Sequence, residues 1–79
     1  MSAQVAWTDV TASSVSVGDV VRVKMHSYTG VVGDIHNGRY CEVLDVRGGD
    51  VIVCSIDDVM PVLAETHHSP HVLEKMAIS

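Results

Sequence analysis

The chain has few of the residues that build aromatic cores or covalent frameworks. Its 79 residues include no phenylalanine, one tryptophan, two tyrosines, two prolines and two cysteines. Two cysteines are too few for the disulfide framework of a small secreted domain, so we predict that Cys41 and Cys54 are buried thiols in a reducing cytoplasm. The sequence also lacks an apolar run of membrane-spanning length and a basic start followed by an apolar stretch. We therefore expect neither a membrane span nor a classical signal peptide.

Basic residues are scarce too. Five Lys and Arg stand against ten Asp and Glu, which gives a formal net charge of -5. Proteins that bind nucleic acid usually carry a clustered basic surface, so this balance argues against phosphate binding over the whole molecule. A local basic patch stays open as an alternative, because all but one of the bases fall in the middle of the chain: Arg22, Lys24, Arg39 and Arg47.

What the chain has in abundance is valine. Hydrophobic residues make up 47% of the sequence, and the branched side chain of valine suits a pleated strand better than a helix. The length allows a single core, and a chain of this size buries only about 60% of the surface that its unfolded form exposes. We therefore expect a mostly β domain with more apolar material than it can hide, covered by a partner or by self-association.

Alternation and turn signals predict a series of strands. Val20 to His26 alternates apolar and polar residues, which indicates a half-buried strand. Asn37-Gly38 is typical of a type I′ hairpin, and Gly48-Gly49 indicates a second tight turn. The predicted strands are 20–26, 31–36, 39–46, 51–56 and a short closing strand at 59–62.

The two ends of the chain differ from this middle part. Residues 1–16 predict an N-terminal arm or edge strand, since Val5 and Trp7 alternate before a polar connector. Residues 64–79 predict a linker followed by a short helix. Ser69 and Pro70 are favourable at a helix start, and Val72, Leu73 and Met76 would form an apolar stripe that must dock on another surface.

The stretch from Tyr28 to Ile35 reads Tyr-Thr-Gly-Val-Val-Gly-Asp-Ile. An aromatic residue, two glycines three apart and a final β-branched residue resemble a KOW motif, found in small SH3-like barrels of ribosomal proteins and of elongation factors of the NusG type. The resemblance implies an all-β, five-stranded SH3-like barrel over 17–63, with the N-terminal arm and the short C-terminal helix outside it. It also implies contact with RNA or protein. Val31, Val32 and Asp34 stand where that family often has basic residues, which favours protein.

The predicted hairpins divide the side chains between two faces of the sheet. One face, taken as the interior, would carry Val31, Ile35, Tyr40, Leu44, Val46, Val51 and Val53. The other would carry Val32, Cys41, Val43, Ile52, Cys54 and Ile56, which is too apolar for water. A β-bulge in either hairpin would exchange the faces locally. The residues expected in an interface, or in packing of the helix on the barrel, are Val43, Ile52, Cys54, Ile56, Val72, Leu73 and Met76.

These patterns favour a non-catalytic protein–protein interaction or assembly module, which associates with itself or with another protein. The alternative is a KOW-type nucleic-acid or transcription-machinery module that uses the four clustered bases. No set of residues assembles into a catalytic site, so we expect no enzyme, no cofactor and no metal. The segment His67-His68-Ser69-Pro70-His71 is interpreted as a polar linker, because Pro70 disrupts helical spacing and a zinc site needs three or four convergent ligands.

Overall fold

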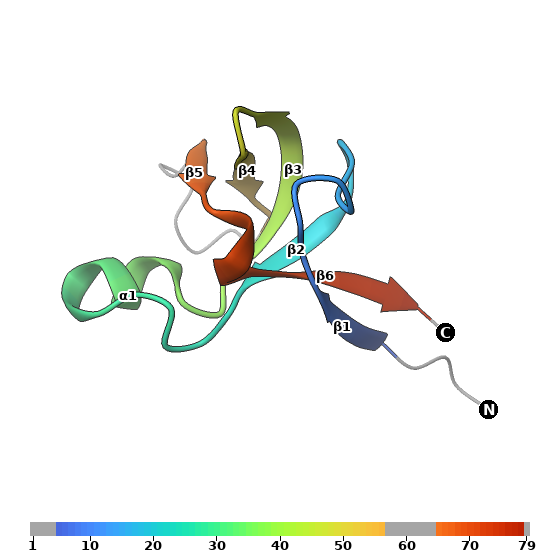
Figure 1. The fold of residues 1–79 in the computed structure, drawn as a ribbon. Coiled ribbons are helices and arrows are strands. Elements are labelled where there is room, and N and C mark those ends of the chain that lie inside the picture. The colour runs from blue at the N-terminus through green and yellow to red at the C-terminus, as the bar shows by residue number, and fades with distance from the viewer. Residues whose placement is uncertain (1–4, 57–64, 79) are drawn as a thin grey trace.

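The structure is a computed structural model, and it describes residues 5–56 and 65–78. Strands dominate these residues, with one short helix and one 3-10 turn (Figure 1). The elements are β1 (Val5–Asp9), β2 (Val20–Val23), α1 (Gly30–His36), β3 (Tyr40–Arg47), β4 (Asp50–Ser55), β5 (Thr66–His68), the 3-10 turn Pro70–Val72 and β6 (Leu73–Ile78).

These six strands form one antiparallel sheet in the order β1-β6-β2-β3-β4-β5. The last strand therefore lies between the first two, and Val5 pairs with Ile78. In Figure 1 the ribbon of β1 and β6 extends to one side of the molecule and α1 to the other, while β3, β4 and β5 stand above them. Residues from the two ends of the sequence thus share one end of the sheet.

The predicted five-stranded SH3-like barrel with a C-terminal helix is wrong. The described residues form one open sheet of six strands, and the helix lies in the middle of the sequence. The predicted closing strand at 59–62 lies outside the described residues. In the described parts of the chain, no helix is long and apolar enough to cross a membrane.

The C-terminal segment is a strand because it has two neighbours to pair with. Pro70–Val72 forms a 3-10 turn where the helix was expected to begin, and β6 then pairs with β1 on one side and β2 on the other. A helix of two or three turns is marginal in water. As a strand, the segment gains two ladders of backbone hydrogen bonds, and Leu73 is completely buried. Pairing in the sheet therefore stabilises the strand more than the helical spacing of apolar residues stabilises a helix.

The predicted strand at 31–36 is helix α1, because both edges of β3 are already occupied. β2 pairs with one edge, with Val21 opposite Cys41, and β4 pairs with the other. A type I′ turn also needs positive φ at both central residues, but φ is -60° at Asn37 and +77° at Gly38. The segment after β2 therefore leaves the sheet and returns at β3.

Valine fills the core. The buried cluster lies on one side of the sheet and includes two residues, Val10 and Val15, from the connection between β1 and β2. Tyr28 and Val46 pack against it. The cluster consists of Val10, Val15, Val21, Val23, Cys41, Val43, Val51, Val53, Val72 and Leu73.

A β-bulge explains why the predicted faces are exchanged in the first half of β3. The turn at Gly48-Gly49 is confirmed, with Val46 opposite Val51, but the register shifts between Val43 and Asp45. Val43 rather than Leu44 then faces Val53. An extra residue in one strand moves every side chain beyond it to the opposite face. Val43 is consequently buried and Leu44 exposed.

The same shift changes the relation of the cysteines. Cys41 lies opposite Ser55 and points into the core, whereas Cys54 lies opposite Glu42 on the other side of the sheet. They were predicted to share a face, and they do not. Both are thiols, as predicted, but only Cys41 is buried, whereas Cys54 is half-buried.

Candidate functional site

The side of the sheet opposite the core, called here the outer face, carries large and charged side chains. Side-chain direction alternates along each strand, so cross-strand partners lie on the same side. Trp7 is opposite Met76 and Arg22 is opposite both Glu74 and Tyr40. The outer face across β1, β6, β2 and β3, with Lys24 just after β2, therefore presents Trp7, Asp9, Arg22, Lys24, Tyr40, Glu42, Glu74 and Met76.

Two of the three aromatic residues of the Phe, Trp and Tyr types meet on this face. The ring centroids of Trp7 and Tyr40 are 5.7 Å apart with an interplanar angle of 37°. The guanidinium carbon of Arg22 lies 4.1 Å from the centre of the Trp7 ring and 6.0 Å from that of Tyr40. Trp7 is half-buried and Tyr40 is 42% exposed. We call Trp7, Arg22, Tyr40 and Met76 the aromatic patch.

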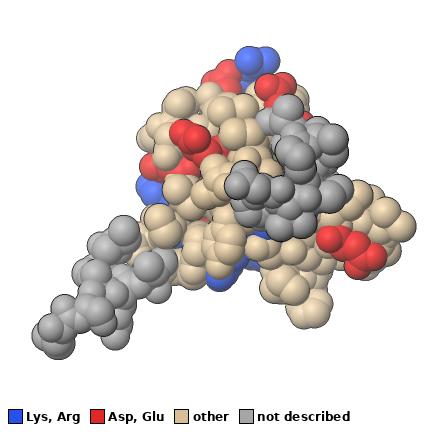
Figure 2. All heavy atoms as spheres, turned by 180° about the vertical axis from the view of Figure 1, so that it is seen from behind, with Lys and Arg blue, Asp and Glu red and all other residues tan. Residues whose placement is uncertain are grey.

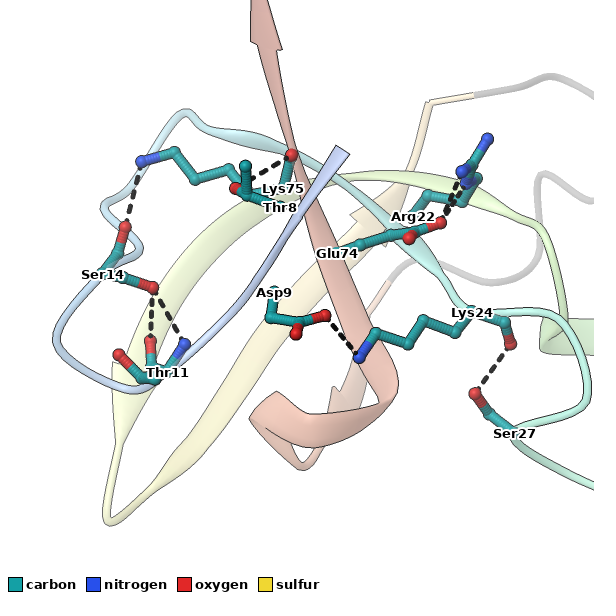
Figure 3. Close-up of polar contacts among 9 residues, drawn as sticks. All are labelled: Thr8, Asp9, Thr11, Ser14, Arg22, Lys24, Ser27, Glu74 and Lys75. Atoms are coloured by element: carbon teal, nitrogen blue, oxygen red, sulfur yellow. Dashed lines mark hydrogen bonds and ion pairs between the residues drawn. The ribbon is translucent and has the colours of Figure 1, made fainter. Parts of the chain in front are cut away.

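Two ion pairs lie on the outer face (Figure 3), and one of them holds Arg22 of the patch. Arg22 Nε donates to Glu74 Oε2 at 2.6 Å, and Lys24 Nζ lies 2.9 Å from Asp9 Oδ1. Partial burial by itself lowers the pKa of Arg22, but hydrogen bonds and charges from Glu74 and Tyr40 outweigh it and leave the pKa raised. The guanidinium therefore stays charged and fixed above the indole, where a cation–π contact contributes about 0.5–1 kcal/mol.

The four bases predicted to bind nucleic acid do not form one patch. Arg22 and Lys24 share the outer face but each faces a carboxylate. Arg39 donates from Nε to the carbonyl of Ile35 at 2.8 Å, and Arg47 pairs with Asp45 at 2.6 Å beside the β3–β4 turn. Among the described residues on the face seen in Figure 2, Lys and Arg atoms occupy only small separate areas.

The residues predicted for an interface are also dispersed. Val43, Val72 and Leu73 lie in the chain's own core, and Ile52 is buried outside that cluster. Cys54 and Met76 are half-buried, while Ile56 is 47% exposed. Of this set, only Met76 lies within the aromatic patch.

A second group of polar side chains lies between the α1 segment and β5. The hydroxyl of Tyr28 is 2.6 Å from Nδ1 of His68, and Thr66 Oγ1 is 3.0 Å from Nε2 of the same ring. The ring of His36 meets that of His68 edge-on at 5.1 Å. His68 is only 4% exposed. The expected polar linker is thus in part strand β5, in which His68 is buried.

Burial sets the protonation of this group. It lowers the pKa of His68 to about 4, with the charges of His36 and His67 acting in the same direction. Burial also raises the pKa of Tyr28. His68 is therefore a neutral imidazole, and its two ring nitrogens hydrogen-bond to the hydroxyl groups of Tyr28 and Thr66. The arrangement joins β5 to the loop before α1.

The described residues offer no other kind of site. In residues 5–56 and 65–78, no group of three or more His, Cys, Asp or Glu could hold a metal ion. No small-molecule pocket is found in that part of the chain. The aromatic patch is consequently the feature with the most distinctive surface chemistry.

Comparison with family models, curated proteins and solved structures finds no match to this chain. The resemblance of Tyr28–Ile35 to a KOW motif therefore stays a prediction, and the structure places that segment in a loop followed by α1. Sequence reasoning missed Trp7 and Tyr40 as surface residues. Trp7 is the single tryptophan, and this rarity could have marked it as a candidate site residue. The pairing of β1 with β6 that brings Trp7 over β2 joins residues far apart in the sequence, so no local pattern indicates it.

Proposed function

We propose that the chain is a non-catalytic protein-binding module whose contact surface is the aromatic patch. The observation that carries the proposal is the stack of Arg22 on Trp7 beside an exposed Tyr40. Trp, Tyr and Arg are the residue types most enriched at energetic hot spots of protein interfaces. The two thiols fit a reducing cytoplasm as its location.

The order within the patch also supports this role. The salt bridge to Glu74 and the packing on Trp7 fix the long side chain of Arg22, which is otherwise flexible. A preorganised surface loses less conformational entropy when a partner binds. A sheet face without a detected pocket among the described residues suits a protein surface better than a small molecule.

The test is binding of a natural partner by three variants. We expect Trp7→Ala and Tyr40→Ala to weaken binding of a protein captured from cells that express the chain by about thirtyfold each, as for a hot spot of about 2 kcal/mol. Val31→Ala is the matched control, because Val31 is 73% exposed but lies on α1. If the partner is a second copy, the same variants shift the sedimentation equilibrium toward monomer.

Circular dichroism must show that each variant keeps the sheet. Equal affinity of all three folded variants and the original chain would contradict the proposal, since the partner would then bind elsewhere.

One observation favours the nucleic-acid alternative. Aromatic rings with Arg and Lys on one face are also the elements of a platform for single-stranded nucleic acid. The outer face nevertheless carries three acids, Asp9, Glu42 and Glu74, against two bases, a local balance of 2 − 3 = −1. This alternative requires saturable, strongly salt-dependent binding of a fluorescent single-stranded oligonucleotide that Trp7→Ala abolishes.

A further inference from the structure

The two edges of the sheet are protected to different degrees. The β5 edge is only three residues long, and Ser69 and Pro70 follow it directly. β1 has five residues, Val-Ala-Trp-Thr-Asp, without proline, lysine or glycine. Its register with β6 is continuous over all five. Natural proteins usually blunt an edge by shortness, charged side chains, proline or a bulge, and of these β1 has only the charge of Asp9 at its end.

The edge of β1 that points away from β6 is unpaired within the described residues. Ala6, Thr8 and Asp9 are exposed. Every second residue of an antiparallel edge strand directs its N–H and C=O away from the sheet. β1 therefore presents a row of backbone donors and acceptors beside the aromatic patch.

Charge at this edge selects a partner. Asp9 has a side chain that is 88% exposed although it pairs with Lys24, and the whole chain has a net charge of -5. A second copy of β1 would bring another Asp and no base to the edge. A segment with a basic side chain beside Asp9 and an apolar one beside Trp7 complements both residues.

We propose that β1 binds an extended segment of another protein as an added antiparallel strand, with the pattern basic–any–apolar facing the aromatic patch. The inference rests on the proposed protein-binding function and specifies its partner. Side chains two apart on a strand share a face. In antiparallel order the residue opposite Asp9 precedes the residue opposite Trp7. The backbone ladder supplies affinity and the two side chains supply specificity.

The probe is a synthetic peptide, Thr-Lys-Thr-Val-Thr, with blocked ends. Because Trp7 is the single tryptophan, its fluorescence reports binding at the patch. We expect a saturable change in fluorescence with this peptide. The dissociation constant should be at least threefold higher for the peptide with Val and Lys exchanged, and it should also be higher for the peptide with Glu in place of Lys. Amide hydrogen exchange should slow in β1 on binding.

Two further peptides and two variants separate strand addition from surface contact. One peptide is N-methylated at the three threonines, which removes the N–H donors along one edge of the added strand. The other is N-methylated at Lys and Val, which removes the donors along the opposite edge. One of these two peptides must fail to bind. Asp9→Asn should raise the dissociation constant about threefold, as for an exposed ion pair. Asp50→Asn, an exposed acid at the β3–β4 turn, should leave it unchanged.

Three results would overturn the inference. They are no saturable signal with either peptide order, full binding by both N-methylated peptides, and a homodimer in which β1 pairs with its own copy. The first two leave the proposed function intact if Trp7→Ala still loses the natural partner. The Trp7→Ala variant has no tryptophan, so its peptide binding is followed by amide hydrogen exchange in β1. Loss of peptide binding in this variant together with an unaffected natural partner would count against the proposed function alone.

Discussion

Single polar side chains contribute to the stability of this fold in addition to its valine core. His68 is buried within hydrogen-bonding distance of Tyr28 on one side and Thr66 on the other. A buried polar group that keeps its partners costs little, but a buried charge is expensive. The stability of the fold is therefore tied to the neutral state of one imidazole.

This state predicts acid sensitivity. The pKa of His68 is about 4 in the folded chain and 6.5 ordinarily, so the unfolded chain binds the proton more tightly. The contribution of neutral His68 to the free energy of unfolding is fully present above pH 6.5 and is lost as the pH falls to about 4. The free energy of unfolding decreases by about 3 kcal/mol over this range. Urea unfolding measured from pH 7 to pH 4 should show the decrease.

Variants separate His68 from the other histidines. His68→Gln should flatten most of the dependence on pH, although it also lowers stability at pH 7. His71→Gln, which changes an exposed residue, should keep the slope of the original chain. Burial and Arg39 lower the pKa of His36, so a small slope remains in the first variant. An unchanged slope in His68→Gln would show that another group is responsible.

At the scale of elements, α1 is held by close contact with the loop before it. The side chain of Asn37 accepts from the Tyr28 N–H at 3.1 Å and donates to the Tyr28 carbonyl at 3.0 Å. Gly33 lies so near that a Cβ atom there would be 2.5 Å from the same carbonyl oxygen. The helix therefore has one face on which only glycine fits.

Gly33→Ala should destabilise the fold, opposite to the usual effect of alanine in a helix. Alanine normally stabilises a helix interior by about 0.5–1 kcal/mol relative to glycine. Here the backbone must shift, and we expect a loss of about 1–3 kcal/mol, the range for overpacking. Thermal unfolding measures it. Asp34→Ala, at an exposed position of the same helix, is the control, and equal stability of the two variants would refute the contact.

At the scale of the whole molecule, β6 joins the ends of the sequence. It pairs with β1 through Trp7 and Met76 and with β2 through Val23 and Leu73. β1 pairs with β6 alone among the described strands. The core thus depends on the last strand more than on the first.

Truncation should show this difference. Deleting residues 1–9 removes an edge strand and should cost about 2 kcal/mol of cross-strand contacts while cooperative unfolding remains. Deleting residues 73–79 removes Leu73 and both ladders of β6, and we expect an unfolded chain by circular dichroism and amide exchange. A folded C-terminal deletion would show that β6 is dispensable.

The sequence predicted the features that rest on neighbours along the chain. Strands near 20–26, 39–46 and 51–56, and the turn at Gly48-Gly49, follow from alternation and glycine conformation. The aromatic patch did not follow, because Trp7 and Tyr40 meet only after β6 has aligned β1 with β2.

By itself the sequence determined a valine-built, mostly β chain with a small core, because branched side chains and tight turns act locally. Only the tertiary structure decided that 30–36 is a helix and 73–78 a strand, since the free edges of the sheet set which segment can pair. It also decided, through a bulge after Val43, which apolar residues are buried. The physical reason is that strand pairing and register are long-range choices, settled by the burial of the whole sheet.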